Sequence, residues 1–171
     1  NIVTLNQGWD APDREFFYFT PQGSPIVLYD WFLSLEQPNN TTLFRNDAYL
    51  KNFGLIPWKK TTKNPDAIPI GMTIDKSLYS NESHLGINCS ACHVTEVLIG
   101  NKTVLIDGGV SHFDLWTFMT KLFESMKATY NDADKLGRFA DRLSQDPAKI
   151  KARLRIAIQS QENWHVRNHA S

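Results

Sequence analysis

Cys89-Ser90-Ala91-Cys92-His93 is the stretch on which the fold and chemistry of this sequence depend. The two thiols of a Cys-x-x-Cys-His motif add across the vinyl groups of haem, and the histidine is thereby placed beneath the iron as an axial ligand. The sequence has two cysteines, and both lie in this motif. The motif therefore predicts one covalently bound haem c, with Cys89 and Cys92 as attachment residues and His93 as the proximal iron ligand.

Two other uses of a Cys-x-x-Cys pair compete with this interpretation. A structural zinc site needs about four ligands, so His93 would have to be joined by a fourth group such as His84 or His112. A redox-active dithiol is expected at the start of a helix within a βαβ unit. Here the motif follows sequence typical of a loop and precedes a predicted hairpin, so both alternatives fit less well than haem.

Length and composition are those of an ordinary globular domain. The chain has 171 residues, 42% of them hydrophobic, and its 18 Lys and Arg residues balance its 18 Asp and Glu residues. This balance gives no support to a nucleic-acid partner. No apolar run approaches the roughly 20 residues of a membrane span, and the first residues lack a signal-peptide pattern. We expect a bacterial protein, periplasmic or secreted, whose export signal has been removed.

Helix signals recur along the chain. Ala11-Pro12-Asp13 predicts a short helix that ends near Pro21, and Ser24-Pro25 predicts a second helix from Ile26 to Glu36. Further helices are predicted over residues 47–53, 111–130, 132–143 and 147–158. The helix over residues 111–130 is expected to begin with the capping box Ser111-His112-Phe113-Asp114.

Two stretches lack a helical pattern. Residues 55–83, rich in Pro, Gly, Asn and Thr, indicate a long loop of the kind that usually has a function. Residues 96–99 and 103–106 surround Gly100-Asn101-Lys102 and predict a β-hairpin.

The sequence therefore predicts a mainly α, loop-rich fold: a c-type cytochrome-like haem domain with a short β-hairpin after the haem motif. We expect a single domain over residues 1–171. Within it, residues 1–83 hold the N-terminal helices and the long loop, residues 84–130 the motif, hairpin and following helix, and residues 131–171 the C-terminal helices.

The group opposite His93 decides the function, because a strong second ligand suits electron transfer and an open position suits binding of oxygen or peroxide. Two residues are the better candidates for a distal ligand: His112, beside a glycine pair, and Met72, in a loop next to Gly71. Other candidates are Met119, Met126, His84, His165 and His169. The two helical methionines are more typical of core packing.

Haem also needs partners for its propionates and an apolar wall. Cationic candidates before the motif are Arg14, Arg45, Lys59 and Lys60. Aromatic candidates for the wall are Trp31, Phe53, Trp58, Phe113 and Trp116, for each of which ordinary core packing is an equal alternative.

Several stretches of residues 7–125 resemble one known family, the N-terminal haem region of the bacterial rubber oxygenases and their relatives in the di-haem cytochrome c peroxidase superfamily. The stretches are Gln7–Asp10, Asp13–Tyr18, Thr20–Ser24, Tyr29–Glu36, Asn64–Asp66, Ile68–Met72, Leu85–His93 and Ile106–Gly109. The haem motif is highly specific for haem, and the flanking stretches are moderately specific for the family.

The resemblance implies a periplasmic or secreted protein whose first haem is the reactive one, with His93 proximal and the distal side open to dioxygen or peroxide. It also implies a second haem on a second motif, which this sequence lacks. We therefore expect a fragment or subunit of a haem-dependent oxygenase or peroxidase, with a second haem-bearing chain or domain and a redox partner protein. The alternatives are a single-haem electron-transfer cytochrome and a haem subunit of a larger electron-transfer complex.

Overall fold

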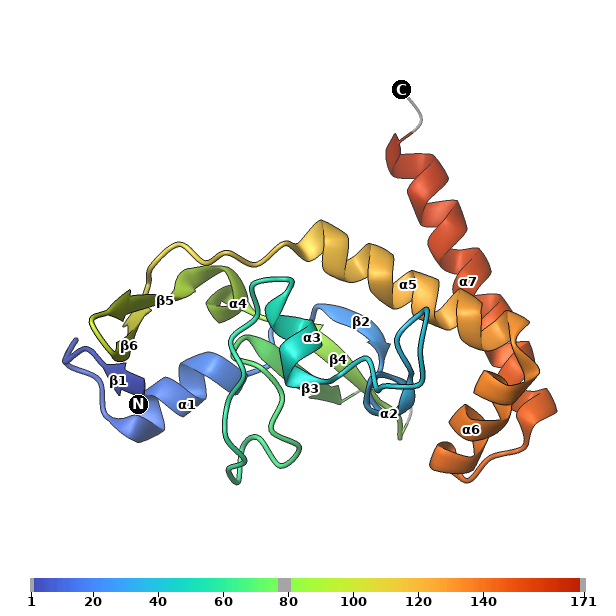
Figure 1. Ribbon diagram of the computed structural model, residues 1–171, viewed down its shortest axis with the longest axis horizontal. Helices are drawn as coiled ribbons and strands as arrows, with labels where there is room; N and C mark the ends of the chain where they lie inside the picture. The colour runs from blue at the N-terminus through green and yellow to red at the C-terminus, as the bar shows by residue number, and fades with distance from the viewer. Residues whose placement is uncertain (1, 77–80, 170–171) are drawn as a thin grey trace. The chain divides into compact units, whose positions relative to one another are not determined.

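The chain folds as two compact units, each assembled from separate stretches of sequence (Figure 1). The computed structural model describes residues 2–76 and 81–169, with side chains up to residue 163. We call residues 1–29 and 47–115 the sheet unit, and residues 30–46 and 116–171 the helical unit.

The sheet unit contains two three-stranded sheets. In the first, β4 (Ser83–Ile87) lies between β2 (Pro25–Leu28) and β3 (Met72–Lys76) and pairs antiparallel with both. In the second, β6 (Lys102–Asp107) lies between β1 (Ile2–Thr4) and β5 (Val94–Ile99). The helix α4 (Cys89–His93) connects β4 of one sheet to β5 of the other (Figure 1).

Two predictions in this unit are confirmed. Strands β5 and β6 form the expected antiparallel hairpin, with Val97 opposite Val104 and Gly100 at the turn with a positive φ of 62°. Helix α1 (Ala11–Phe19) begins as the sequence indicates, with Asp10 as its N-cap and a reciprocal capping box between Asp10 and Asp13. Helix α3 (Asp47–Lys51) is shorter than the predicted 47–53.

The predicted fold class is wrong. The structure is a mixed α/β fold with 44% helix and 20% strand among its described residues, and not a mainly α, cytochrome-like domain. The predicted helix from Ile26 to Glu36 is instead the strand β2 followed by the short helix α2 (Tyr29–Ser34). The predicted loop over residues 55–83 contains β3 and the start of β4. In each case pairing between distant segments overrides the local pattern.

The helical unit is built on three consecutive helices. They are α5 (Leu115–Asn131), α6 (Ala133–Leu143) and α7 (Pro147–His169). Asp132 caps α6 and accepts hydrogen bonds from the backbone N–H groups of Asp134 and Lys135, and the helix ends at Leu143, the end that the sequence predicts. Helix α7 begins at the predicted residue but continues beyond residue 158.

The predicted start of α5 is wrong by four residues. The Ser111 hydroxyl accepts a hydrogen bond from Phe113 N, but Asp114 N donates to the carbonyl of Phe53, so the turn at residues 111–114 is not helical. The predicted capping box therefore does not open the helix.

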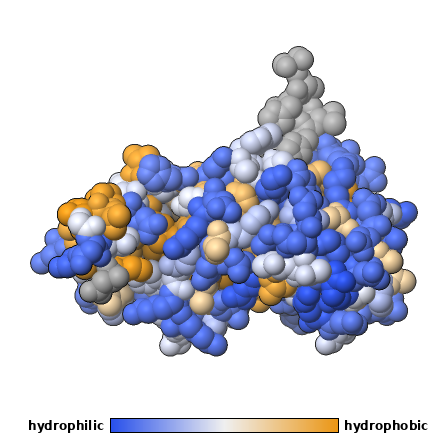
Figure 2. Space-filling model, viewed as in Figure 1, coloured by the Kyte–Doolittle hydropathy of each residue, from blue (hydrophilic) through white to orange (hydrophobic). Residues whose placement is uncertain are grey.

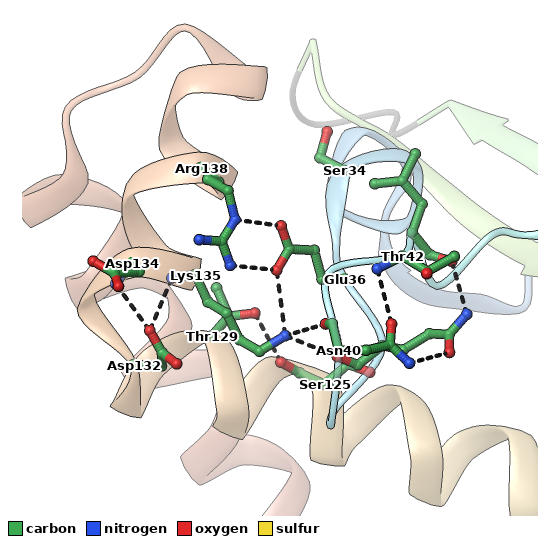
Figure 3. A network of polar contacts seen from close by, with 12 residues as sticks. Ser34, Glu36, Asn40, Thr42, Ser125, Thr129, Asp132, Asp134, Lys135 and Arg138 are labelled. Atoms are coloured by element: carbon green, nitrogen blue, oxygen red, sulfur yellow. Dashed lines mark hydrogen bonds and ion pairs between the residues drawn. The ribbon is translucent and has the colours of Figure 1, made fainter.

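One buried carboxylate organises the polar contacts of the helical unit (Figure 3). The Glu36 side chain is 2% exposed and receives two hydrogen bonds from Arg138, at 2.7 and 2.8 Å. Arg142 donates at 2.7 Å and Lys135 at 3.3 Å. The hydrogen bonds from Arg138, with those from Arg142 and Lys135, outweigh burial and lower the pKa of Glu36 to about 2.

Within residues 2–76 and 81–169, no helix combines the length and the hydropathy that a membrane span needs.

Candidate functional site

The motif residues lie on the five-residue helix α4. The two cysteines and the histidine, whose side chains can bind haem, share its exposed face. Cys89, Cys92 and His93 are exposed, whereas Ser90 and Ala91 are buried. Positions separated by three and four residues lie on the same side of a helix, which explains this division. Neither thiol is in a disulfide. The two sulfurs and the imidazole are therefore accessible from one side of the motif.

Asn88, the residue before the motif, fixes the start of α4. Its side-chain oxygen accepts hydrogen bonds from Ser90 N at 3.0 Å and from Ser90 Oγ at 2.7 Å, which makes Asn88 the N-cap. Its side-chain nitrogen donates to the carbonyls of Phe17, Tyr18 and Thr20 at 3.0 to 3.3 Å. Asn88 is 5% exposed, so one buried amide joins α4 to the end of α1.

The buried face of α4 fits closely against a glycine. Gly71 has a φ of 83°, its N–H donates to the carbonyl of Tyr18, and its carbonyl accepts from Asn88 N. A Cβ atom at residue 71 would overlap the backbone N and Cα of Ala91. Gly71 is thus required both for its backbone conformation and for the approach of α4.

The C-terminal end of α4 is held by the turn after the hairpin. Gly108 N donates to the carbonyl of His93 at 2.7 Å, and Ser111 N donates to the carbonyl of Cys92 at 3.1 Å. These bonds satisfy carbonyl groups that a helix end leaves without partners. Both ends of the motif are therefore fixed by backbone hydrogen bonds, and its exposed side chains project from a defined frame.

Asp107 anchors the same turn to α1. Its side chain is 1% exposed and accepts from Arg14 Nε at 2.9 Å and from the Tyr18 hydroxyl at 2.5 Å. Burial, and then the hydrogen bond to Asp107, raise the pKa of Tyr18 far above its usual value, so the phenol stays protonated as a donor. Arg14 also donates to the carbonyl of Leu5 and serves this structural network.

A largely apolar cavity of about 410 Å³ lies along α1 and the residues on either side of it. Its lining residues are Trp9, Asp13, Phe16, Phe17, Thr20 and Gln22. Gln22 connects the cavity to the motif, because its side-chain oxygen accepts hydrogen bonds from both N and Sγ of Cys89. The volume is within the usual range for a small-molecule site. The aromatic residues of this cavity are thus not those that the sequence predicts as an apolar wall.

The candidate distal ligands occupy different environments. Met72 is fully buried at the start of β3, whereas His112 is exposed in the turn that follows the hairpin. His84 lies on the central strand β4, opposite Leu28 and Asp75. Met126 is buried in α5, and Met119 there is partly buried. The side chains of His165 and His169 lie outside those that the structure describes. A distal role for Met72 or His112 stays a prediction.

The zinc alternative finds no ligand set among the described residues, where no group of three His, Cys, Asp or Glu side chains is arranged to hold a metal ion. One feature favours the dithiol alternative: α4 follows the strand β4 directly, where the sequence predicts a loop. However, β4 and β5 belong to different sheets, so this is not a βαβ unit.

Sequence reasoning missed the residues that hold the motif: Asn88, Gly71, Tyr18 and Gln22. A signal existed for Asn88, because asparagine directly before a helix is a preferred N-cap. Nothing in the local sequence pairs Gln22 with Cys89 or Gly71 with Ala91, since these partners are brought together by the fold.

Comparisons with known proteins identify one distant relative and assign no activity. The chain is 25% identical over 178 residues to the uncharacterized protein y4iJ of Sinorhizobium fredii (strain NBRC 101917 / NGR234). The match covers 92% of this chain and 29% of that protein, so the chain spans less than a third of its relative's length. No model of a known protein family matches the sequence, and no solved structure matches it. The chain is thus similar to one segment of a longer protein whose name states no function.

Proposed function

We propose that this chain carries one covalently bound haem c and has a redox role. The observation that carries the proposal is the placement of Cys89, Cys92 and His93 together on the exposed face of α4. Covalent attachment needs these groups on one side of the motif, because both thioether bonds and the proximal ligand belong to the same haem. Both cysteines are exposed, and neither is in a disulfide. The mixed α/β fold does not weaken this proposal, since chemistry is set by sites and not by fold class.

The residues of the chain have distinct parts in this proposal. Cys89 and Cys92 hold the cofactor, and His93 supplies the proximal ligand. Asn88 and Gly71 fix the direction in which α4 presents these groups. The cavity lined by Trp9, Phe16 and Phe17 offers an apolar surface, and Gln22 links that surface to Cys89. When bound, the haem would supply a redox-active iron that could bind dioxygen or peroxide.

The first candidate function is activation of dioxygen or peroxide, as the resemblance to di-haem oxygenases and peroxidases implies. In this case the chain is the haem region of a longer bacterial periplasmic or secreted protein. A second haem-bearing chain or domain and a redox partner protein would complete it. The relative, more than three times as long as the segment it shares with this chain, is compatible with such an arrangement.

A second candidate function, electron transfer, is favoured by the position of His112. This exposed residue follows Ser111, whose N–H is bonded to the carbonyl of Cys92. His112 therefore belongs to the turn that contacts the motif, whereas the side chain of Met72 is fully buried. An iron held by both His93 and His112 would be six-coordinate and suited to electron transfer.

Covalent attachment is tested on full-length protein exported in a bacterium with a haem-attachment system. We expect the intact mass to exceed the polypeptide mass by one haem, and we expect a pyridine haemochrome spectrum of the c type. The double variant Cys89→Ser, Cys92→Ser should show neither. A polypeptide mass without haem in fully exported wild-type protein would falsify the proposal.

Carbon monoxide separates the two candidate functions. An open distal position predicts a rapid change in the spectrum of the reduced protein when carbon monoxide is added without denaturant. Ligation by His112 predicts little change, and His112→Ala should then restore carbon monoxide binding. A low-spin spectrum that persists in both His112→Ala and Met72→Ala would exclude these two ligands.

A further inference from the structure

We propose that Gln22 is a positioning residue for Cys89, so that the two attachment cysteines are held differently. This inference rests on the proposed haem attachment. The Gln22 side-chain oxygen accepts from Cys89 N at 3.1 Å and from Cys89 Sγ at 3.2 Å. No hydrogen bond to the thiol of Cys92 occurs among the described residues. The structure thus gives the Cys89 thiol a hydrogen-bond acceptor that the Cys92 thiol lacks among the described residues.

The loop that carries Gln22 is itself tied to the motif. Thr20 accepts a hydrogen bond on its carbonyl from Asn88, the residue directly before Cys89. Gly23 has a φ of 74°, which turns the chain after Gln22 towards β2. The contact is therefore reciprocal: the side chain of Asn88 reaches residues 17–20, and the side chain of Gln22 reaches back to Cys89. The hydrogen bonds from Asn88 to residues 17–20 and the bond from Cys89 N to Gln22 together define where the Gln22 oxygen lies relative to the Cys89 sulfur.

The position of Gln22 suits the chemistry of attachment. In thioether formation the S–H bond breaks, an S–C bond forms at one vinyl carbon, and the hydrogen is transferred to the other. This addition is balanced and needs no further reactant. Gln22 also lines the apolar cavity with Trp9, Phe16 and Phe17. One side chain, Gln22, therefore both lines this apolar surface and sets the direction of the Cys89 thiol.

The first test uses the thiols before haem is attached, in full-length protein produced without export. Both cysteines are alkylated with iodoacetamide, and the rate at each is measured by peptide mass spectrometry. In Gln22→Met, which keeps side-chain length but loses the acceptor, we expect the rate at Cys89 relative to Cys92 to rise about two- to fivefold, as for loss of one modest hydrogen bond. Gln22→Glu keeps an acceptor and should not raise the ratio.

The matched control is Gln159→Met, the same change at an exposed position on α7. It should leave the ratio at the wild-type value. Far-ultraviolet circular dichroism confirms that each variant is folded. An unchanged ratio in folded Gln22→Met would overturn the proposal, whether or not the protein carries haem.

The second test uses exported, haem-loaded protein. We expect Gln22→Met to accumulate at least twofold more protein linked through Cys92 alone than wild type, with an α-band shifted towards that of Cys89→Ser. Gln22→Glu should restore the double linkage. Absence of haem from the wild type would refute the proposed function, whereas equal double linkage in wild type and Gln22→Met would refute the role of Gln22 alone.

Discussion

Glu36 is a carboxylate shared by three cationic side chains, and its protonation links stability to pH. Its pKa of about 2 in the folded protein is below the value near 4.3 expected when the chain is unfolded. A lowered folded-state pKa contributes stability that is fully present above the unfolded value and is lost as the pH falls through the folded one. The contribution at neutral pH is about 3 kcal/mol.

We therefore expect the free energy of unfolding to fall between about pH 5 and pH 2 by up to about 3 kcal/mol more in wild type than in Glu36→Gln. Urea denaturation followed by circular dichroism at several pH values measures this difference. At neutral pH the variant should be less stable by about 3 kcal/mol, because the buried Lys135 and the partly exposed Arg138 and Arg142 lose their charged partner. Equal pH dependence in the two proteins would contradict the network described above.

Gly71 determines how closely the helix α4, which carries the motif, can pack against the chain. In Gly71→Ala the new methyl group meets the backbone of Ala91, so α4 must shift, and we expect a loss of more than about 3 kcal/mol in unfolding free energy. Gly100→Ala is the matched control, since Gly100 also has a positive φ but has no atom within 4 Å of the added Cβ. That variant should lose only about 1 kcal/mol. Chemical denaturation of both proteins makes the comparison, and equal losses would show that packing at Ala91 is unimportant.

At the scale of elements, the hairpin presents an exposed apolar edge. Strand β5 is at the edge of its sheet, and Val97, Leu98 and Ile99 on it are 40%, 73% and 62% exposed. Figure 2 shows hydrophobic side chains on the surface where β5 and β6 lie. Unprotected apolar edge strands favour association with other strands.

Leu98→Thr with Ile99→Thr should therefore reduce concentration-dependent association, as measured by sedimentation velocity. Threonine keeps the preference for strand structure, so the unfolding free energy should change by less than about 0.5 kcal/mol. The buried counterpart Leu105→Thr, on β6, should lose about 3 kcal/mol. Association that is unaffected by the double substitution would show that this edge is not responsible.

Elements with local signals could be predicted from the sequence, and elements that depend on distant partners could not. Helices α1 and α6 begin at capping residues, Asp10 and Asp132, and the hairpin has its turn at Gly100. In contrast, Ser24-Pro25 looks like a helix start, yet Pro25 pairs with Gly86, some sixty residues away. The same limit applies to the site: the motif itself is visible in the sequence, but the contact between Gln22 and Cys89 exists only in the folded chain.

At the scale of the whole molecule, each unit is discontinuous in sequence. The helical unit combines residues 30–46 with residues from 116 onwards, and Glu36 in the first stretch is bonded to Lys135, Arg138 and Arg142 in the second. Cooperative groups in folded proteins follow such contacts and not proximity in sequence.

In hydrogen exchange under mildly denaturing conditions, amides of residues 30–46 should therefore exchange together with those of residues 116–163. Glu36→Gln should accelerate both groups by a similar factor, because the ion pairs join them. Exchange measured by mass spectrometry on overlapping peptides resolves the two stretches. Acceleration confined to residues 30–46 would show that the ion pairs do not join the stretches into one cooperative group.

The Asn88 side chain donates hydrogen bonds to three carbonyls at the end of α1, and this has a practical consequence for protein engineering. A synthetic peptide copied from residues 84–96 would contain the pentapeptide and its N-cap Asn88, but not the carbonyls of residues 17–20 that hold the Asn88 side chain, nor Gly71. Transplanting the motif into another scaffold would mean importing residues 10–23 and the turn around Gly71 as well, with their mutual geometry intact. The smallest transferable site therefore consists of several separate segments of the chain, and the pentapeptide alone is not enough.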